Sequence, residues 1–183
     1  MKTNLEIEFK TKISEEIYNN LMKEYNLEKQ ILTQINYYFE TEDNFLKNNK
    51  ITLRIRQKGE QYKLTSKLHT DEGTQETHIY LTKNDALKMI ENGFNAHIIG
   101  FPHYVKNIAK LQTERVSFLY KKGKMFFDKN TYYGNTDYEI EFEADSKDEG
   151  KIIFLNFLKE KNIPYEKLKS KSYRAISKAQ ETK

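Results

Sequence analysis

Two stretches of the sequence place carboxylates at every second position, with apolar residues between them. In LEIEFK these are Glu6 and Glu8, followed at the same spacing by Lys10, and in DYEIEFE they include Glu139 and Glu141. Successive side chains of a β-strand point to opposite faces, so each stretch predicts one charged face and one apolar face. Clustered carboxylates supply the oxygen ligands that Mg²⁺ and Mn²⁺ prefer, so these faces are candidate sites for a divalent cation.

Three further stretches show the same alternation with cations in place of carboxylates. They contain Arg54 and Arg56 in ITLRIRQ, Lys63 and Lys67 in QYKLTSKL, and Arg115 in TERVSF. Like charges two positions apart repel, so such faces call for counter-charges that their own strands do not supply. Arginine can bind two oxygens of an anion at once and lysine acts as a point charge, which together suit a polyphosphate. Carboxylates and cations together indicate a metal–polyphosphate site.

Strands and helices that would position these residues follow from the hydrophobic periodicity. Alternating or β-branched and aromatic stretches predict strands at 5–11, 33–41, 51–57, 61–68, 73–82, 110–121, 124–130 and 135–144. Helical periodicity predicts helices at 14–25, 82–93, 146–162 and 169–180, with short helical turns on either side of Pro102.

Local signals mark turns and helix ends. Ser14 suits the N-cap of the first helix, Gly93 suits the end of the second, and Gly59 suits the turn of a hairpin. Ser146 and Glu149 have capping-box spacing at the start of the third helix. The apolar stripes predicted to face the core are Ile17, Leu21 and Tyr25 in the first helix and Ile152, Leu155 and Leu158 in the third.

Strands dominate this pattern, and their hairpin-like connections predict antiparallel pairing. The apolar stripes of the helices need a partner surface, and the apolar strand faces are the natural one, which leaves the charged faces pointing inward. We therefore predict an α+β, β-dominated fold: a closed eight-stranded antiparallel β-barrel, or tunnel, with a charged interior and helices outside. A half-exposed sheet with one wet face would show the same alternation and is the alternative. Only 7 Gly and 2 Pro occur and no linker is visible, so one domain spanning 1–183 is expected.

Composition excludes several function classes. The chain has no cysteine, which excludes disulfides, thiolate metal sites and thiol nucleophiles. Its net charge of +4 is too small to favour nucleic acid as a partner. No apolar run is long enough to span a membrane, so we expect a cytoplasmic monomer or homodimer without a membrane partner. The four histidines lack the spacing of a zinc site; they are His69, His78, His97 and His103.

The motifs resemble, in their order along the chain, those of the CYTH proteins, also called triphosphate tunnel metalloenzymes. Glu6–Lys10 looks like the ExExK signature of that family. The further matches are Tyr38–Thr41, Arg54–Arg56, Lys63–Lys67, Glu76, Arg115, Asp128 and Glu139–Glu141. The resemblance spans nearly the whole chain and is strongest to the small single-domain bacterial branch. It implies an eight-stranded tunnel and metal-dependent activity on triphosphates.

The resemblance also implies residue roles. Glu6, Glu8 and Glu141 would hold Mg²⁺ or Mn²⁺. The residues implied to line the substrate site are Lys10, Arg54, Arg56, Lys63, Lys67, Glu76, Arg115, Asp128 and Lys171.

Several of these roles have alternatives. Glu139 would orient water or a second metal, or pair with an arginine. Tyr38 would act with Lys67 in choosing the triphosphate, or could be a core aromatic. Glu76 could instead neutralise an arginine, Asp128 could be a turn residue, and Lys63 could face solvent. Lys169 is the alternative to Lys171, and His78 is expected to have no catalytic role.

Two positions depart from the pattern of the family. Thr113 stands where triphosphatases of this type often have lysine, so one phosphate-binding cation is missing. Glu40 replaces the commoner aspartate and is expected to be structural.

The function predicted from these residues is metal-dependent hydrolysis of a triphosphate, above all inorganic triphosphate, and otherwise a nucleoside or thiamine triphosphate. Phosphoryl transfer depends on positioning and charge neutralisation, and the chain offers no nucleophile for a covalent intermediate. One alternative is a class IV-type adenylate cyclase, although no adenine pocket is evident in the sequence. A second is a module that binds polyphosphate or a nucleotide without turnover.

Overall fold

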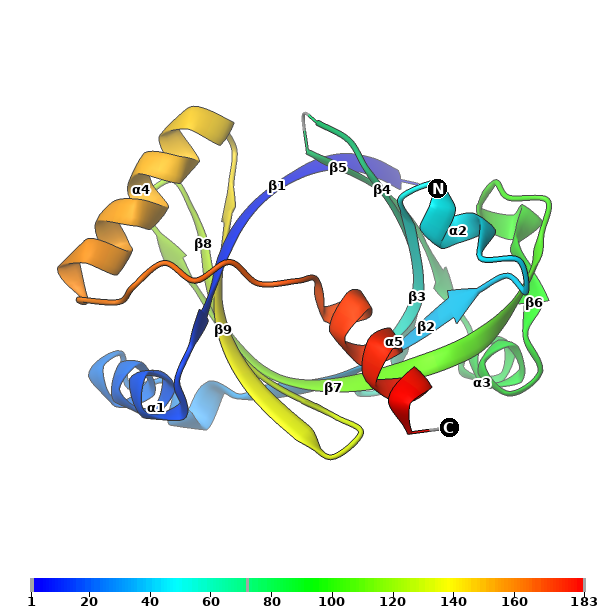
Figure 1. The fold of residues 1–183 in the computed structure, drawn as a ribbon, viewed down its shortest axis with the longest axis horizontal. Helices are drawn as coiled ribbons and strands as arrows, with labels where there is room; N and C mark the ends of the chain where they lie inside the picture. Colours follow the sequence, from blue (N-terminus) through cyan, green and yellow to red (C-terminus); the bar gives the residue numbers. More distant parts are fainter. Residues whose placement is uncertain (1, 72, 183) are drawn as a thin grey trace. The chain divides into compact units, whose positions relative to one another are not determined.

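Antiparallel strands contain more residues than the helices do, and the computed structural model describes residues 2–71 and 73–182, with side chains from Glu6 onward. The strands are β1 (Lys2–Ile13), β2 (Leu32–Glu40), β3 (Ile51–Lys58), β4 (Gln61–His69), β5 (Thr74–Leu81), β6 (Phe94–Asn95), β7 (Tyr104–Tyr120), β8 (Gly123–Tyr132) and β9 (Asn135–Ala144). The α-helices are α1 (Glu15–Glu24), α2 (Phe45–Asn48), α3 (Lys83–Asn92), α4 (Lys147–Glu160) and α5 (Lys171–Glu181) (Figure 1). Two short 3₁₀ helices are η1 (Glu28–Gln30) and η2 (Ala96–Ile99).

The strand order confirms the predicted fold class. In the described part of the chain the order is β2-β3-β4-β5-β1-β9-β8-β7-β6, and β2 also pairs with β7. The pairings of β1 with β9, β2 with β3, β3 with β4, β4 with β5 and β8 with β9 are antiparallel. From β2 to β7 the order returns on itself, which is the topology of a closed eight-stranded barrel, and β6 is a short addition.

Internal contacts divide the chain into two units. The first unit comprises Met1–Leu5, Gln34–Gln112 and Ser170–Lys183, and the second comprises Glu6–Thr33 and Thr113–Lys169. The expectation of a single domain stays a prediction. Among the described residues, no helix has the length and apolar character needed to cross a membrane.

The core of the second unit lies on the apolar faces of β8 and β9. Phe127, Ile140 and Phe142 are buried there and belong to one cluster with Phe154 and Phe157 of α4. Each side chain of this kind contributes about 1.5–3 kcal/mol when it is fully removed from water. Because residues alternate along β9, burying Ile140 and Phe142 places the neighbouring carboxylates on the opposite face.

The core of the first unit repeats this arrangement with β2, β3 and β4. Phe39, Leu53, Ile55 and Leu64 form one buried cluster that also contains Ala86 of α3. The residues between them in β3 are arginines, which the alternation directs to the opposite face.

Most of the predicted caps and turns are confirmed. The Ser14 hydroxyl accepts a hydrogen bond from the Ile17 N–H, and Gly59 lies between β3 and β4 with φ +56°. Gly93 follows α3 with φ +81°, and a Cβ there would lie 2.4 Å from the Val105 carbonyl oxygen, so only glycine fits. In α1, Leu21 is buried as predicted, and Ile17 and Tyr25 pack against the same core.

The predicted buried face of α4 is confirmed at Leu158 and wrong at its other two residues. Ile152 and Leu155 are 61% and 41% exposed, and the buried face instead contains Ile153, Phe154 and Phe157 beside Leu158. Both faces of this helix carry apolar residues, so its periodicity did not identify the inner one, and the bulkier aromatic residues pack inward. Ser146 occupies the N-cap position, but its side chain makes no capping hydrogen bond there, so the capping box does not form.

The segment around Pro102 differs from the prediction on one side. The turn before it is η2, as expected, but the residues after it begin β7 at Tyr104 instead of a helical turn. Val105, Ala109 and Leu111 are buried at even spacing, which is the alternation of a strand extending the one predicted from 110. The single-turn helix α2 was not predicted.

Candidate functional site

In the second unit, the pairing of β1 with β9 brings the two carboxylate stretches together. Glu8 lies opposite Glu143, and Lys10 lies opposite Glu141. Directly opposed residues of antiparallel strands have Cβ atoms about 4.5–5.5 Å apart. The register therefore gathers charges from two distant parts of the sequence on one strand face.

Two groups of carboxylates have the geometry to hold a metal ion. One contains Glu6, Glu8 and Glu143, all partly buried, and the other contains the buried Asp128, Glu139 and Glu141. Within each group the candidate ligand oxygens lie within 4.8 Å of one another. The structure thus groups Glu6 and Glu8 with Glu143, and places Glu141 with residues of the second group. Glu143 was not among the predicted ligands, although it continues the same alternation after Glu141.

The electrostatics of this face fit a cation. Burial, followed by repulsion from Glu8, raises the pKa of Glu141 to about 7, although Arg115 acts in the opposite direction. Burial, followed by repulsion from Glu6, raises the pKa of Glu143 to about 7. Burial and repulsion between neighbouring carboxylates both disfavour the charged forms of Glu141 and Glu143. A divalent cation would stabilise the charged forms, and the grouped carboxylate oxygens are the ligands that Mg²⁺ and Mn²⁺ prefer, so the residues present fit either ion.

Arg115 is held by carboxylates of its own unit. Its Nε and Nη2 donate to the two oxygens of Asp128, at 2.7 and 2.5 Å, and Nη2 also donates to Glu141. The guanidinium carbon lies 4.3 Å from the centre of the Phe126 ring. Asp128 is fully buried in the middle of β8, so the alternative of a turn residue is wrong. Lys10 likewise pairs with Glu8, at 2.8 Å between Nζ and Oε1.

In the first unit, β3, β4 and β5 bring the predicted phosphate-binding cations to one strand face. Arg56 lies opposite Lys63, and Lys67 lies opposite both Thr52 of β3 and Glu76 of β5. The Glu76 carboxylate lies 3.7 Å from the Lys63 Nζ and 3.5 Å from the Lys67 Nζ.

Glu76 balances only part of this positive charge. Burial raises the pKa of Glu76, but Lys67, Arg54 and Lys63 lower it, and its net pKa is below the ordinary value. Burial lowers the pKa of Lys63, and Arg56 adds to the decrease while Glu76 opposes it. The described set on this strand face therefore has a net positive charge, which suits an anion. Its members are Arg54, Arg56, Lys63, Lys67 and Glu76.

Tyr38 and Lys171 also lie in the first unit. Tyr38 is 1% exposed and lies opposite Arg54 in the register of β2 and β3. Arg56 Nε donates to Asn36 Oδ1 at 2.9 Å, which fixes the orientation of this guanidinium. Lys171 is the first residue of α5 and is buried. None of these contacts assigns a role to Tyr38 or Lys171, so the predicted roles stay predictions.

The family model of the CYTH domain matches residues 4–176. This chain belongs to the CYTH domain family. It is 33% identical over 189 residues to the Bacillus subtilis protein named "Putative triphosphatase YjbK", with 95% of each chain covered. A crystal structure of "a putative adenylate cyclase" from Bacillus halodurans is 32% identical, with a TM-score of 0.86 and 95% and 98% of the two chains covered. HpAC1 from Hippeastrum, described as showing a dominant triphosphatase activity, shares the fold at 20% identity, with a TM-score of 0.77 and 94% and 95% coverage.

Two residues depart from the pattern expected of this CYTH chain, and the side chains of both form hydrogen bonds. Glu40 is structural, as predicted, because its carboxylate accepts hydrogen bonds from the N–H groups of Thr41, Leu46 and Lys47 and so holds the start of α2.

The other departure is Thr113, which is buried and belongs to a network of hydrogen-bonded side chains. Its hydroxyl donates to Asn130 Oδ1 at 2.8 Å, and the Asn130 amide donates to Asp137 at 3.1 Å. Asp137 also accepts a hydrogen bond from the Tyr132 hydroxyl at 2.6 Å. A hydrogen-bonded side chain therefore occupies the position where a lysine was expected to bind phosphate.

Proposed function

We propose that this CYTH protein is a triphosphatase that depends on a divalent metal. The observation that carries the proposal is the gathering of carboxylates from β1, β8 and β9, with the pKa values of Glu141 and Glu143 raised to about 7. The excess of cations in the first unit supports a polyphosphate as the anion. The name of the Bacillus subtilis relative supports the same activity.

Glu6, Glu8 and Glu141, joined by Glu143, would hold Mg²⁺ or Mn²⁺. When bound, that ion supplies positive charge to the phosphate oxygens and an ordered position for water. Lys10, Arg54 and Lys67 bind and orient phosphate oxygens, which spreads the charge that develops in the transition state.

Glu139 accepts a hydrogen bond from the attacking water and orients it toward the terminal phosphorus. The water oxygen forms a bond to that phosphorus and the water gives up a proton to the solvent, while the bond between the phosphorus and its bridging oxygen breaks. The products are orthophosphate and a diphosphate. The minimal substrate is inorganic triphosphate, because these roles involve only phosphate oxygens.

The test is phosphate release from inorganic triphosphate, ATP and thiamine triphosphate with Mg²⁺ or Mn²⁺. Glu8→Gln removes a ligand charge from β1, and Glu60→Gln is the matched control because Glu60 is exposed and pairs with Lys83. We expect rapid release that needs the metal, is lost in Glu8→Gln and is retained in Glu60→Gln. Binding of inorganic triphosphate without any release would reject the triphosphatase and favour a polyphosphate-binding module.

Adenylate cyclisation is the second candidate, because the Bacillus halodurans relative carries that name at 32% identity. In that reaction a ribose hydroxyl attacks the α-phosphate, and pyrophosphate leaves. Each ATP reaction is therefore also assayed for cyclic AMP and pyrophosphate. Their appearance in place of ADP and orthophosphate would assign cyclisation, and not hydrolysis, to the protein.

A cytoplasmic location, a monomeric or homodimeric state and the lack of nucleic-acid and membrane partners stay predictions.

A further inference from the structure

The outer face of α4 exposes apolar surface that the core of the second unit does not use. Ile152 and Leu155 are both exposed, and residues three apart are neighbours on one face of a helix. Figure 1 shows α4 on the outer side of β8 and β9. Adjacent exposed apolar side chains form a patch that another molecule can cover.

Tight packing of the inner face of α4 keeps its outer face exposed. A Cβ atom at Gly150 would lie 2.4 Å from the Ala144 Cβ, so the helix approaches β9 as closely as its backbone allows. The Phe154 ring stacks on Phe9, with the ring centres 6.1 Å apart. Turning the helix to bury Ile152 would remove Phe154 from the core, so the outer apolar surface is a fixed feature of the second unit.

The same face of α4 begins with an acid and ends with a base. Asp148 precedes Ile152 by four residues, Lys159 follows Leu155 by four, and both charged side chains are exposed. With 3.6 residues per turn, these four side chains lie within about 60° of one another around the helix axis. They form one stripe, which we call the outer stripe.

The outer stripe is complementary to a second copy of itself when the two helices run antiparallel. A two-fold axis level with the point midway between Ile153 and Phe154 places Asp148 at the height of Lys159 of the second copy. The same axis places Ile152 at the height of Leu155 of the second copy. Because a two-fold contact repeats every pair, both ends of the helix pair gain opposite charges and its centre buries four apolar side chains.

We propose that the outer stripe of α4 binds the outer stripe of a second copy of this chain, which forms a two-fold symmetric dimer. Opposite charges at the two ends favour a second copy over an anionic membrane surface, which would attract only the lysine. The helix has 14 residues and is therefore about 21 Å long, so the contact is small and the dimer is a weak, reversible one. The proposal does not depend on the reaction that the protein catalyses.

Sedimentation velocity of the full chain tests the dimer. We expect the wild-type protein to pass from monomer to dimer between about 1 and 300 µM. Ile152→Lys places a charge at the centre of the contact, and we expect it to weaken dimerisation by at least about tenfold. Leu155→Ala is a second variant that keeps the test valid if the first fails to fold, and circular dichroism checks the folding of each.

Charge exchange tests the antiparallel arrangement. Asp148→Lys puts two lysines together at each end of the pair, and Lys159→Asp puts two carboxylates there, so each variant alone should dimerise about tenfold more weakly. An equimolar mixture of the two variants restores opposite charges at both ends and should regain the affinity of the wild type. Glu160→Lys is the matched control, because this exposed residue points about 100° away from Lys159 and should leave dimerisation unchanged.

A wild-type protein that stays monomeric up to about 300 µM would overturn the proposal, as would a dimer that Ile152→Lys and Leu155→Ala leave intact. Failure of the mixed charge variants to regain affinity would overturn the antiparallel pairing. Equal weakening by Glu160→Lys would show that overall charge, and not the outer stripe, controls association.

Discussion

The two units use the same strand alternation to hold opposite charges, and they balance those charges differently. In the second unit, Arg115 pairs with Asp128 and Glu141, and Lys10 pairs with Glu8, yet Glu143 still has a raised pKa. In the first unit, a single carboxylate, Glu76, accompanies four cations of the described set.

The difference indicates which kind of ligand each charged face suits. On the acidic face, burial and mutual repulsion disfavour the charged carboxylates, so an added metal ion would stabilise them. On the basic face, the described set of four cations and Glu76 has a net positive charge, so phosphate oxygens would stabilise it. Charged groups removed from bulk water need such partners.

Glu141→Ala should have the largest effect, because it removes a carboxylate that both contacts Arg115 and is assigned to the metal. We expect a loss of about 10³-fold in kcat for inorganic triphosphate, comparable to removing a principal electrostatic group from an active site. Steady-state phosphate release at saturating Mn²⁺ measures this, with Glu60→Ala as the exposed control. Activity within about threefold of the wild type would remove Glu141 from the proposed site.

Asp128→Ala should lower the free energy of unfolding of the second unit. The variant leaves Arg115 without its bidentate partner, and breaking a buried pair in this way costs about 3–5 kcal/mol. Urea unfolding followed by circular dichroism measures the loss, and Asp145→Ala is the control because that carboxylate is exposed. Equal stabilities of the two variants would mean that Arg115 does not depend on Asp128.

Arg54→Ala tests the basic strand face of the first unit. We expect kcat/KM for inorganic triphosphate to fall about 10²-fold, because a nearly buried guanidinium assigned to phosphate is lost. The salt dependence of KM should also become weaker, whereas Glu141→Ala should leave it unchanged. Lys58→Ala, an exposed cation on the same strand, is the control, and an equal effect there would indicate long-range attraction instead of a phosphate contact.

The sequence was sufficient for the strand faces and the fold class, because both depend on local alternation. Glu6, Glu8, Arg54 and Arg56 could be assigned to charged faces from their spacing alone. The order of the motifs also identified the family, which the match over residues 4–176 confirms.

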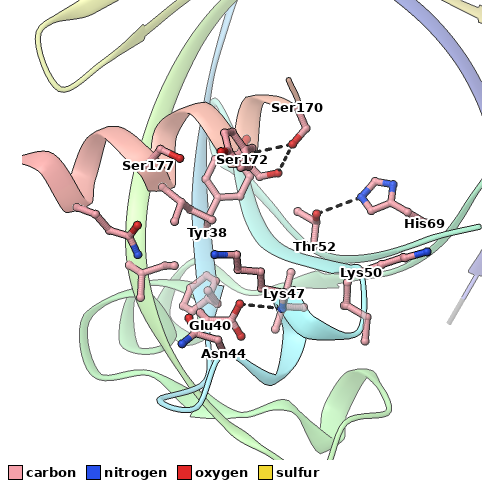
Figure 2. A pocket seen from close by; sticks show the side chains of 17 residues that line it. Tyr38, Glu40, Asn44, Lys47, Lys50, Thr52, His69, Ser170, Ser172 and Ser177 are labelled. Atoms are coloured by element: carbon pink, nitrogen blue, oxygen red, sulfur yellow. Dashed lines mark hydrogen bonds between the residues drawn. The ribbon is translucent and has the colours of Figure 1, made fainter. Parts of the chain in front are cut away.

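The sequence was not sufficient for contacts that depend on register and on distant segments. Alternation does not say whether Glu8 lies opposite Glu141 or Glu143, and only the paired register shows that it is Glu143. Asp128 could not be distinguished from a turn residue until β8 was seen to continue past it. A cavity in the first unit (Figure 2) is lined by residues of β2, β3 and α5, which no local pattern brings together.

Thr113→Val should have the smallest effect, and it tests whether the position that departs from the family pattern is structural. Valine preserves the shape of threonine but removes the hydroxyl that donates to Asn130 Oδ1. Leaving a buried acceptor without this donor should lower the free energy of unfolding by about 1–2 kcal/mol. Urea unfolding measures the loss against Thr131→Val, which alters an exposed threonine of β8.

Because the proposed mechanism assigns no phosphate contact to Thr113, kcat/KM of Thr113→Val should stay within about twofold of the wild type. A larger loss of activity at unchanged stability would show that this hydroxyl, in place of the missing lysine, contributes to the reaction.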